Sequence, residues 1–305
     1  MPEVEQEILN INVHIDCDGK CEGCEKYFGC TLAQKDQMLL RRRMDKAEKA
    51  MSRIKHKIIT VGGKGGVGKT QVAVNLAMAL AMRGRRVAIL DQSFDGPCVP
   101  IMLGVEGKGI GYTEEGLVPT EGPLGIRVVS MGLILPEDEV VTWFHNMKRN
   151  ATEEMISHVL YGDQDYLIID VPAGTSSDTV NIIQYIPDMS GAVVVTTPSM
   201  VSQAVAYKVT LLLQQAKVPV FGVLENMGTF TCPQCGEGVD IMQSGAGERL
   251  AEKCKVPFLG TIPFDVQVAD CGDDGIPFVY RHPDSEAAKV LDAMVDYLEG
   301  QVWKG

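Results

Sequence analysis

The sequence lacks three features that would assign the protein to a membrane, an export pathway or a nucleic acid. It has no uninterrupted apolar run of about 18 residues, the length that a membrane-spanning helix needs. Residues 1–30 have no apolar segment like the core of a secretory signal peptide. Positive charge is scarce, since 28 Lys and Arg are outnumbered by 40 Asp and Glu, which gives a net charge of −12 and disfavours nucleic-acid binding. We therefore expect a cytoplasmic protein with no nucleic-acid and no membrane partner.

Cysteine, in contrast, is plentiful and unevenly placed, with nine residues in 305. Without an export signal a reducing compartment is expected, where clustered cysteines are more often metal ligands or redox groups than disulfides. Four crowd the N-terminus, two form a CxxC pair, and three are isolated and predicted to be small, partly buried hydrophobic residues. In that order the groups are Cys17, Cys21, Cys24 and Cys30; Cys232 and Cys235; and Cys98, Cys254 and Cys271.

The pattern along the chain divides it into three segments. Residues 1–30 are short of apolar periodicity and predict a metal-binding arm. Residues 31–56 are rich in helix formers and carry a basic run at 41–43, typical of either a solvated linker helix or a docking helix for an acidic partner. From residue 57 to residue 305, short apolar strands alternate with helices. That alternation predicts one α/β domain: a mostly parallel sheet with helices on both faces.

The individual elements of this domain follow from length, periodicity and flanking turn residues. Residues 104–125 contain seven glycines and little periodicity, so we expect a long surface excursion there. The expected strands are 57–61, 86–90, 126–131, 166–170, 191–197, 218–225 and 257–262, and the expected helices are 70–84, 201–217, 245–255 and 284–300.

The most specific motif is GGKGGVGKT at residues 62–70, which lies between an expected strand and an expected helix. From Gly63 to Thr70 it fits GxxxxGK[ST], a phosphate-binding loop for ATP. Lys69 should reach the β- and γ-phosphates, and Thr70 with the strand-end Asp170 should organise Mg²⁺. The nucleotide-binding residues predicted here are Gly63, Lys64, Gly65, Gly66, Val67, Gly68, Lys69, Thr70 and Gln71.

The loop contains a second lysine, Lys64. With it, the loop resembles that of the deviant P-loop ATPases with GKGGxGK[ST], which include the nitrogenase iron protein, MinD and ParA. Four further runs resemble the Mrp-type iron–sulfur carrier ATPases within that group, and the matches extend in order over roughly residues 57–280. These runs are LDQSFDGPCVPIMLG (90–104), YLIIDVPAGTSSD (166–178), GVLENMGTFTCPQCG (222–236) and SGAGERLAEKCKVPFLGTIPFD (244–265). The resemblance implies a P-loop NTPase fold of the MinD type.

The resemblance also implies roles for particular residues. Lys64 would contact a phosphate across a nucleotide sandwich dimer, Asp91 would position the metal or the attacking water, and Asn226 would contact adenine. Lys64, Lys69 and Asp91 are thus the candidate catalytic residues. The sequence departs from the family at Ser93, where the family has a second aspartate, and at Ala173, where it has proline. Because serine has no carboxylate, we predict slow hydrolysis, with ATP acting mainly as a conformational ligand.

For the CxxC pair, the resemblance implies that Cys232 and Cys235 supply half of a labile [4Fe–4S] cluster. The other half would come from a second copy or from a related paralogue, because a two-fold axis brings the same patch of two subunits together. A zinc knuckle completed elsewhere in the chain is the alternative. The N-terminal spacing resembles a subgroup with a second cluster, although Cys17 lies unusually close to Cys21, and four cysteines suit either [4Fe–4S] or zinc.

These features predict an iron–sulfur scaffold or carrier in which ATP gates assembly or transfer of a cluster to apo-proteins. An ATP-gated electron-transfer protein resembling the nitrogenase iron protein is the first alternative. A positioning ATPase resembling MinD or ParA is the second, although the mostly acidic segment 284–305 disfavours binding to an anionic membrane.

Overall fold

We describe a computed structural model of the 305-residue chain, in which residues 44–136, 143, 145–232, 234–240, 242 and 245–303 are described. The chain divides into two compact units, Met1–Asp45 and Lys46–Gly305. The predicted metal-binding arm at 1–30, with its four cysteines, lies outside the described residues, as does the first half of the predicted linker, residues 31–43. The account below therefore concerns the second unit.

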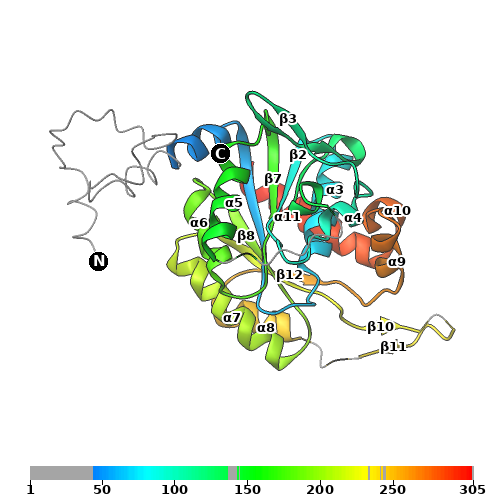
Figure 1. Ribbon diagram of the computed structural model, residues 1–305. Helices are drawn as coiled ribbons and strands as arrows, with labels where there is room; N and C mark the ends of the chain where they lie inside the picture. Colours follow the sequence, from blue (N-terminus) through cyan, green and yellow to red (C-terminus); the bar gives the residue numbers. More distant parts are fainter. Residues whose placement is uncertain are drawn as a thin grey trace. The chain divides into compact units, whose positions relative to one another are not determined.

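The described residues form an eight-stranded sheet with the order β12-β9-β8-β1-β7-β2-β6-β5 (Figure 1). All neighbouring strands are parallel except β5, which runs antiparallel to β6 at one edge. The predicted fold class is thereby confirmed. The strands are β1 Ile54–Gly62, β2 Val87–Asp91, β5 Thr120–Glu121, β6 Arg127–Val129, β7 Gln164–Asp170, β8 Gly191–Thr196, β9 Val220–Glu225 and β12 Phe258–Thr261.

Two small antiparallel hairpins stand apart from this sheet. One pairs β3 Gly111–Thr113 with β4 Gly116–Val118, and the other pairs β10 Phe230–Thr231 with β11 Gly238–Val239. The expected excursion at 104–125 thus contains the β3–β4 hairpin and the edge strand β5. These strands were not expected, because strands of two or three residues are too short for a period-two pattern to show. The β10–β11 hairpin extends outward from the body of the unit (Figure 1).

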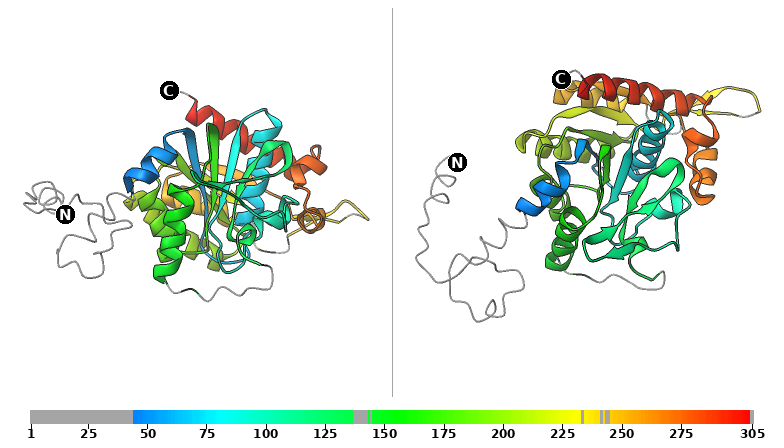
Figure 2. Two further views of the ribbon diagram at one scale, coloured as in Figure 1. Left: turned by 45° about the horizontal axis from the view of Figure 1, so that its top comes forward. Right: turned by 90° about the horizontal axis from the view of Figure 1, so that it is seen from above.

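Helices cover both faces of the sheet (Figure 2). The four helices expected from periodicity are present as α3, α7, α8 and α11, each with ends within two residues of expectation. The others were not foreseen, because they are short or, like α5, carry few apolar residues. The helices are α3 Lys69–Met82, α4 Val99–Met102, α5 His145–Ser157, α6 Ser177–Tyr185, α7 Met200–Gln215, α8 Ala246–Cys254, α9 Gln267–Asp273, α10 Phe278–Arg281 and α11 Glu286–Val302, with 3-10 turns η1 Pro123–Gly125 and η2 Met131–Leu133.

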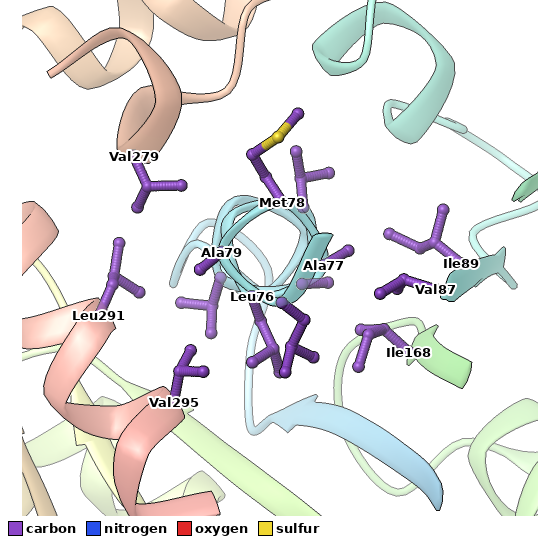
Figure 3. Close-up of a cluster of buried hydrophobic side chains, with 14 of the residues drawn as sticks. Leu76, Ala77, Met78, Ala79, Val87, Ile89, Ile168, Val279, Leu291 and Val295 are labelled. Atoms are coloured by element: carbon purple, nitrogen blue, oxygen red, sulfur yellow. The ribbon is translucent and has the colours of Figure 1, made fainter. Parts of the chain in front are cut away.

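The helix after the phosphate loop, α3, is buried almost all round. Figure 3 shows its residues Leu76 and Ala77 among side chains of the sheet, and Ala79 toward α10 and α11. Neighbouring side chains such as Ile168 of β7 and Leu291 of α11 are also buried. Because tightly packed interiors resist displacement, the N-terminus of α3 is held in a fixed place relative to β1 and β7.

Candidate functional site

The phosphate loop connects β1 to α3 at the carboxyl edge of the sheet and requires its glycines for two reasons. Gly66 and Gly68 have φ values of +76° and +88°, in the left-handed region that favours glycine. In addition, a Cβ on Gly63 would lie 2.4 Å from the backbone nitrogen of Ala206 in α7, and one on Gly68 would lie 2.1 Å from Asn226 Nδ2. The loop is therefore shaped by close contact with its neighbours as well as by its own turns.

Asn226, which follows β9, is joined directly to the phosphate loop. Its Nδ2 donates to the carbonyl oxygen of Val67 at 3.0 Å, and its backbone N–H donates to Thr196 at 2.8 Å. The residue is only 7% exposed. The sequence pointed to Asn226 through its resemblance to an adenine contact. The hydrogen bond from Asn226 to the loop is seen only in the structure, because no sequence motif predicts it.

Lys69, Thr70 and Asp170 meet where α3 begins and β7 ends. Thr70 Oγ1 donates to Asp170 Oδ2 at 2.6 Å, and Thr60 Oγ1 lies 3.4 Å from Asp170 Oδ1. Burial raises the pKa of Asp170 above its usual range, and hydrogen bonding to Thr70 opposes that rise. Burial lowers the pKa of Lys69, and Asp170 opposes that change. A hydroxyl, an ammonium and a carboxylate thus converge in a buried place suited to a magnesium-bound phosphate.

Asp91 lies one strand further along, since β7 separates β2 from β1, and its Cα is paired with that of Asp170. The Asp91 carboxylate accepts hydrogen bonds from Ser93 N–H at 2.9 Å, Ser130 Oγ at 3.0 Å and Val99 N–H at 3.4 Å. Burial, followed by the nearby charge of Asp170, raises the pKa of Asp91. Two carboxylates buried side by side are costly without a cation, which fits a site for Mg²⁺.

The two segments that depart from the family pattern have different surroundings. Asp95, the nearest carboxylate after Ser93, is exposed, and both its oxygens contact Lys148 Nζ at 2.6 and 2.7 Å. In the segment after β7, the N–H of Gly174 donates to the Gly62 carbonyl at 2.9 Å, so the turn containing Ala173 lies against the end of β1, where the phosphate loop begins. Lys64 is exposed on that loop.

Cys232 and Cys235 lie in the turn of the β10–β11 hairpin. The Gly236 N–H donates to the Cys232 carbonyl at 2.8 Å, and the Cys232 N–H donates to Glu237 at 2.9 Å. Hydrogen bonds from the backbone N–H groups of Cys235 and Gln234 lower the pKa of the Cys232 thiol. N–H groups directed at a sulfur stabilise a thiolate, the form that binds metal.

This pair has only two ligands of its own. No cluster of three or more His, Cys, Asp or Glu side chains that could hold a metal ion is found in the part of the chain that the structure describes. Of the isolated cysteines, Cys254 and Cys271 are buried as expected, whereas Cys98 is exposed. None of the described helices is long and apolar enough to cross a membrane.

Comparison with known proteins gives consistent results. The ParA family model described as "NUBPL iron-transfer P-loop NTPase" matches residues 53–299. The iron-sulfur cluster carrier protein of Methanocaldococcus jannaschii is 39% identical over 94% of this chain and 99% of its own length. That of Saccharolobus solfataricus is 42% identical over 83% of this chain and 88% of its own. A cytosolic Fe-S cluster assembly factor NUBP2 homolog of Dictyostelium discoideum is 36% identical over 81% of this chain and 95% of its own.

Solved structures agree with the sequence relatives. A nucleotide-binding protein from Archaeoglobus fulgidus in complex with ADP superposes with a TM-score of 0.67 at 33% identity, covering 76% of this chain and 91% of that one. MinD from Pyrococcus horikoshii complexed with Mg-ADP has a TM-score of 0.60 at 25% identity, covering 80% and 96%.

Proposed function

The chain belongs to the ParA family of iron-transfer P-loop NTPases, which includes iron–sulfur cluster carriers, and we propose that it carries a labile [4Fe–4S] cluster as cargo. In this proposal the cluster is held between two copies of the chain, or between one copy and a related paralogue. It is transferred to apo-proteins in a manner controlled by ATP and Mg²⁺.

The observation that carries the proposal is the exposed hairpin with Cys232 and Cys235. It offers two thiolates, one of them stabilised by backbone N–H groups, and the described residues provide no third ligand beside them. A [4Fe–4S] cluster takes four thiolates. A two-fold axis through this turn supplies them and leaves the cluster near solvent, where an acceptor can reach it.

The residues for nucleotide binding follow from the geometry of the loop. Backbone N–H groups from Gly63 to Gln71 and the α3 N-terminus would cradle the phosphates. Lys69 would neutralise their charge, Thr70 and Asp170 would hold Mg²⁺, and Asp91 would orient water next to it. Lys64, exposed on the loop, would reach a phosphate bound by the partner.

Asn226 gives a physical link between nucleotide and cluster. It contacts the phosphate loop through Val67 and lies six residues before Cys232 on the segment that leads to the hairpin. A nucleotide that engages the Asn226 side chain would therefore act on the phosphate loop through Val67 and on the start of the segment that leads to Cys232. Hydrolysis itself is expected to be slow, because Ser93 is neutral and Asp95 is engaged by Lys148.

The N-terminal cysteines are proposed to hold a second, more stable cluster, with zinc as the alternative. Their number suits either metal. Iron and zinc counts on anaerobically purified protein distinguish the two, and a Cys21→Ser variant should lose this metal while keeping the cluster at Cys232 and Cys235.

The proposed function is tested by anaerobic reconstitution followed by incubation with an apo-ferredoxin. We expect the acceptor to gain a cluster, at a rate that changes when ATP is added. A Cys232→Ser/Cys235→Ser variant should transfer nothing, whereas Cys98→Ser, which changes an exposed thiol outside the hairpin, should transfer normally. Failure to load the acceptor, together with ATP-dependent reduction of an electron acceptor, would overturn the carrier function in favour of electron transfer.

A further inference from the structure

A cavity of about 600 Å³ lies beside the nucleotide site and has no part in the function proposed above. One wall is formed by the segment from the end of β2 to α4, and the other by η2 and the residues that follow it; Glu106, Gly107 and Gly109, which follow α4, complete the lining. The volume falls in the range of ligand pockets, about 300–1,000 Å³. The cavity opens to the surface, because Ile101 and Ile134 on its walls are 38% and 36% exposed.

Both walls are attached to the Asp91 carboxylate. Asp91 accepts hydrogen bonds from the N–H groups of Ser93 and Val99, at either end of the first wall, and from Ser130 Oγ, at the base of the second. Ser130 Oγ in turn accepts from the N–H of Gly132 in η2 at 3.2 Å. A group that separates the walls would therefore alter the hydrogen bonds of a carboxylate that borders the nucleotide site.

The chemistry of the walls restricts what can enter. The side chains are mostly apolar, and none of the described residues that line the cavity is Lys or Arg, whereas Asp95 and Glu106 are among them. Asp95 is neutralised by Lys148, but Glu106 is exposed and no ion pair joins it to another described residue. The apolar lining consists of Phe94, Pro97, Pro100, Ile101, Leu133 and Ile134.

We propose that this cavity receives a segment of a partner protein in which a large apolar side chain is followed closely by a basic one. The apolar side chain would fill the space between Ile101 and Leu133, and the basic one would pair with Glu106 at the rim. The charge of the chain as a whole, −12, also favours a basic segment. The identification of the partner as a cluster-accepting client rests on the proposed function. Binding of such a segment in the cavity does not depend on it.

The test is selection of random dodecapeptides displayed on phage against the full-length protein, with and without ATP. The selected peptides are expected to share an apolar residue next to Lys or Arg. Synthetic copies should bind Ile101→Trp, which fills the cavity, about tenfold more weakly or worse, since buried anchors dominate such contacts. Glu106→Lys should weaken binding about fivefold, while Val239→Trp, on the distant hairpin, should leave it unchanged.

Two outcomes would overturn the proposal. One is a selection that yields no peptide with this pattern, and the other is peptides that bind Ile101→Trp as well as the unchanged protein. The link to Asp91 adds a second measurement. The selected peptide should change the affinity for ATP by about threefold or more, and ATP should change peptide affinity by the same factor, because coupling between sites is reciprocal. Equal affinities with and without the peptide would refute that link.

Failure of the peptide-binding proposal can be distinguished from failure of the proposed carrier function. Peptide binding uses no cysteine, so it should persist in Cys232→Ser/Cys235→Ser. Ile101→Trp, conversely, should still load iron on the hairpin. Loss of cluster transfer with intact peptide binding would count against the carrier function alone.

Discussion

Replacing Gly68 by alanine tests the packing of the phosphate loop against the segment that leads to the cysteine hairpin. Gly68 has a φ of +88°, where a non-glycine residue costs about 1–2 kcal/mol. The new methyl group would also lie 2.1 Å from Asn226 Nδ2 and displace that side chain. The buried carbonyl of Val67 then loses its donor, at a cost of about 1–3 kcal/mol. The free energy of unfolding should therefore fall by about 2–5 kcal/mol.

A double-mutant cycle separates the two contributions. In an Asn226→Ala background the methyl group of Gly68→Ala no longer meets the Asn226 amide, and its distance of 3.8 Å to Gln71 Cβ is an ordinary van der Waals contact. The hydrogen bond to Val67 is already gone. The second substitution should then cost only the backbone part, about 1–2 kcal/mol. The coupling free energy between the two positions should be about 1–3 kcal/mol, with the double variant less destabilised than the sum.

The assay is thermal unfolding of the reduced, nucleotide-free protein, where 1 kcal/mol corresponds to about 2–4 °C for a domain of this size. Gly65→Ala is the matched control, because a Cβ there meets nothing within 4 Å and should change stability by less than about 1 kcal/mol. Additive losses in the double variant, or a loss in Gly65→Ala as large as in Gly68→Ala, would refute this account of the loop.

Three further predictions concern pH, the C-terminal helix and magnesium. Burial lowers the pKa of His56, so the unfolded chain binds a proton at a higher pH than the folded protein does. Between about pH 7 and about pH 5 the melting temperature of the unchanged protein should therefore fall more than that of His56→Phe, and parallel curves would contradict this. Trp303→Phe removes the indole donor to the Tyr166 hydroxyl, 2.6 Å away, and should lower the free energy of unfolding by about 1 kcal/mol in urea titrations. Thr70→Val, which removes the hydroxyl beside Asp170, should weaken binding of MgATP about tenfold more than binding of ATP in EDTA; equal losses would show that Thr70 does not serve Mg²⁺.

The regular part of the fold was predictable because its signals are local. Buried parallel strands read as short apolar runs, and α3, α7, α8 and α11 have apolar residues at helical spacing, so their positions were expected closely. The helix α5 was missed since its surface is mostly polar. The hairpins were missed since two or three residues do not establish a period. Nor does local pattern reveal strand order, which places β7 between β1 and β2.

The candidate site was predictable to the extent that motifs encode it. The phosphate-loop residues, Asp170 and the cysteine pair were proposed from spacing or resemblance. The contact between Asn226 and Val67, and the support that Ser130 gives to Asp91, depend on residues brought together across the sheet. A serine or asparagine that donates to a distant partner carries no spacing signal, so the three-dimensional structure is needed to find it.

The measurement that tests the central claim most directly is the iron and sulfide content of mixed dimers. The background variant carries serine at the N-terminal cysteines, so that only the hairpin can bind a cluster. Chains with and without Cys232→Ser/Cys235→Ser, carrying different tags, are mixed, reconstituted anaerobically and isolated by both tags. We predict about four iron atoms per unchanged dimer and none retained in the mixed dimer, because two thiolates do not hold the cluster. A mixed dimer, or a doubly substituted one, with full iron content would contradict a cluster shared between two chains.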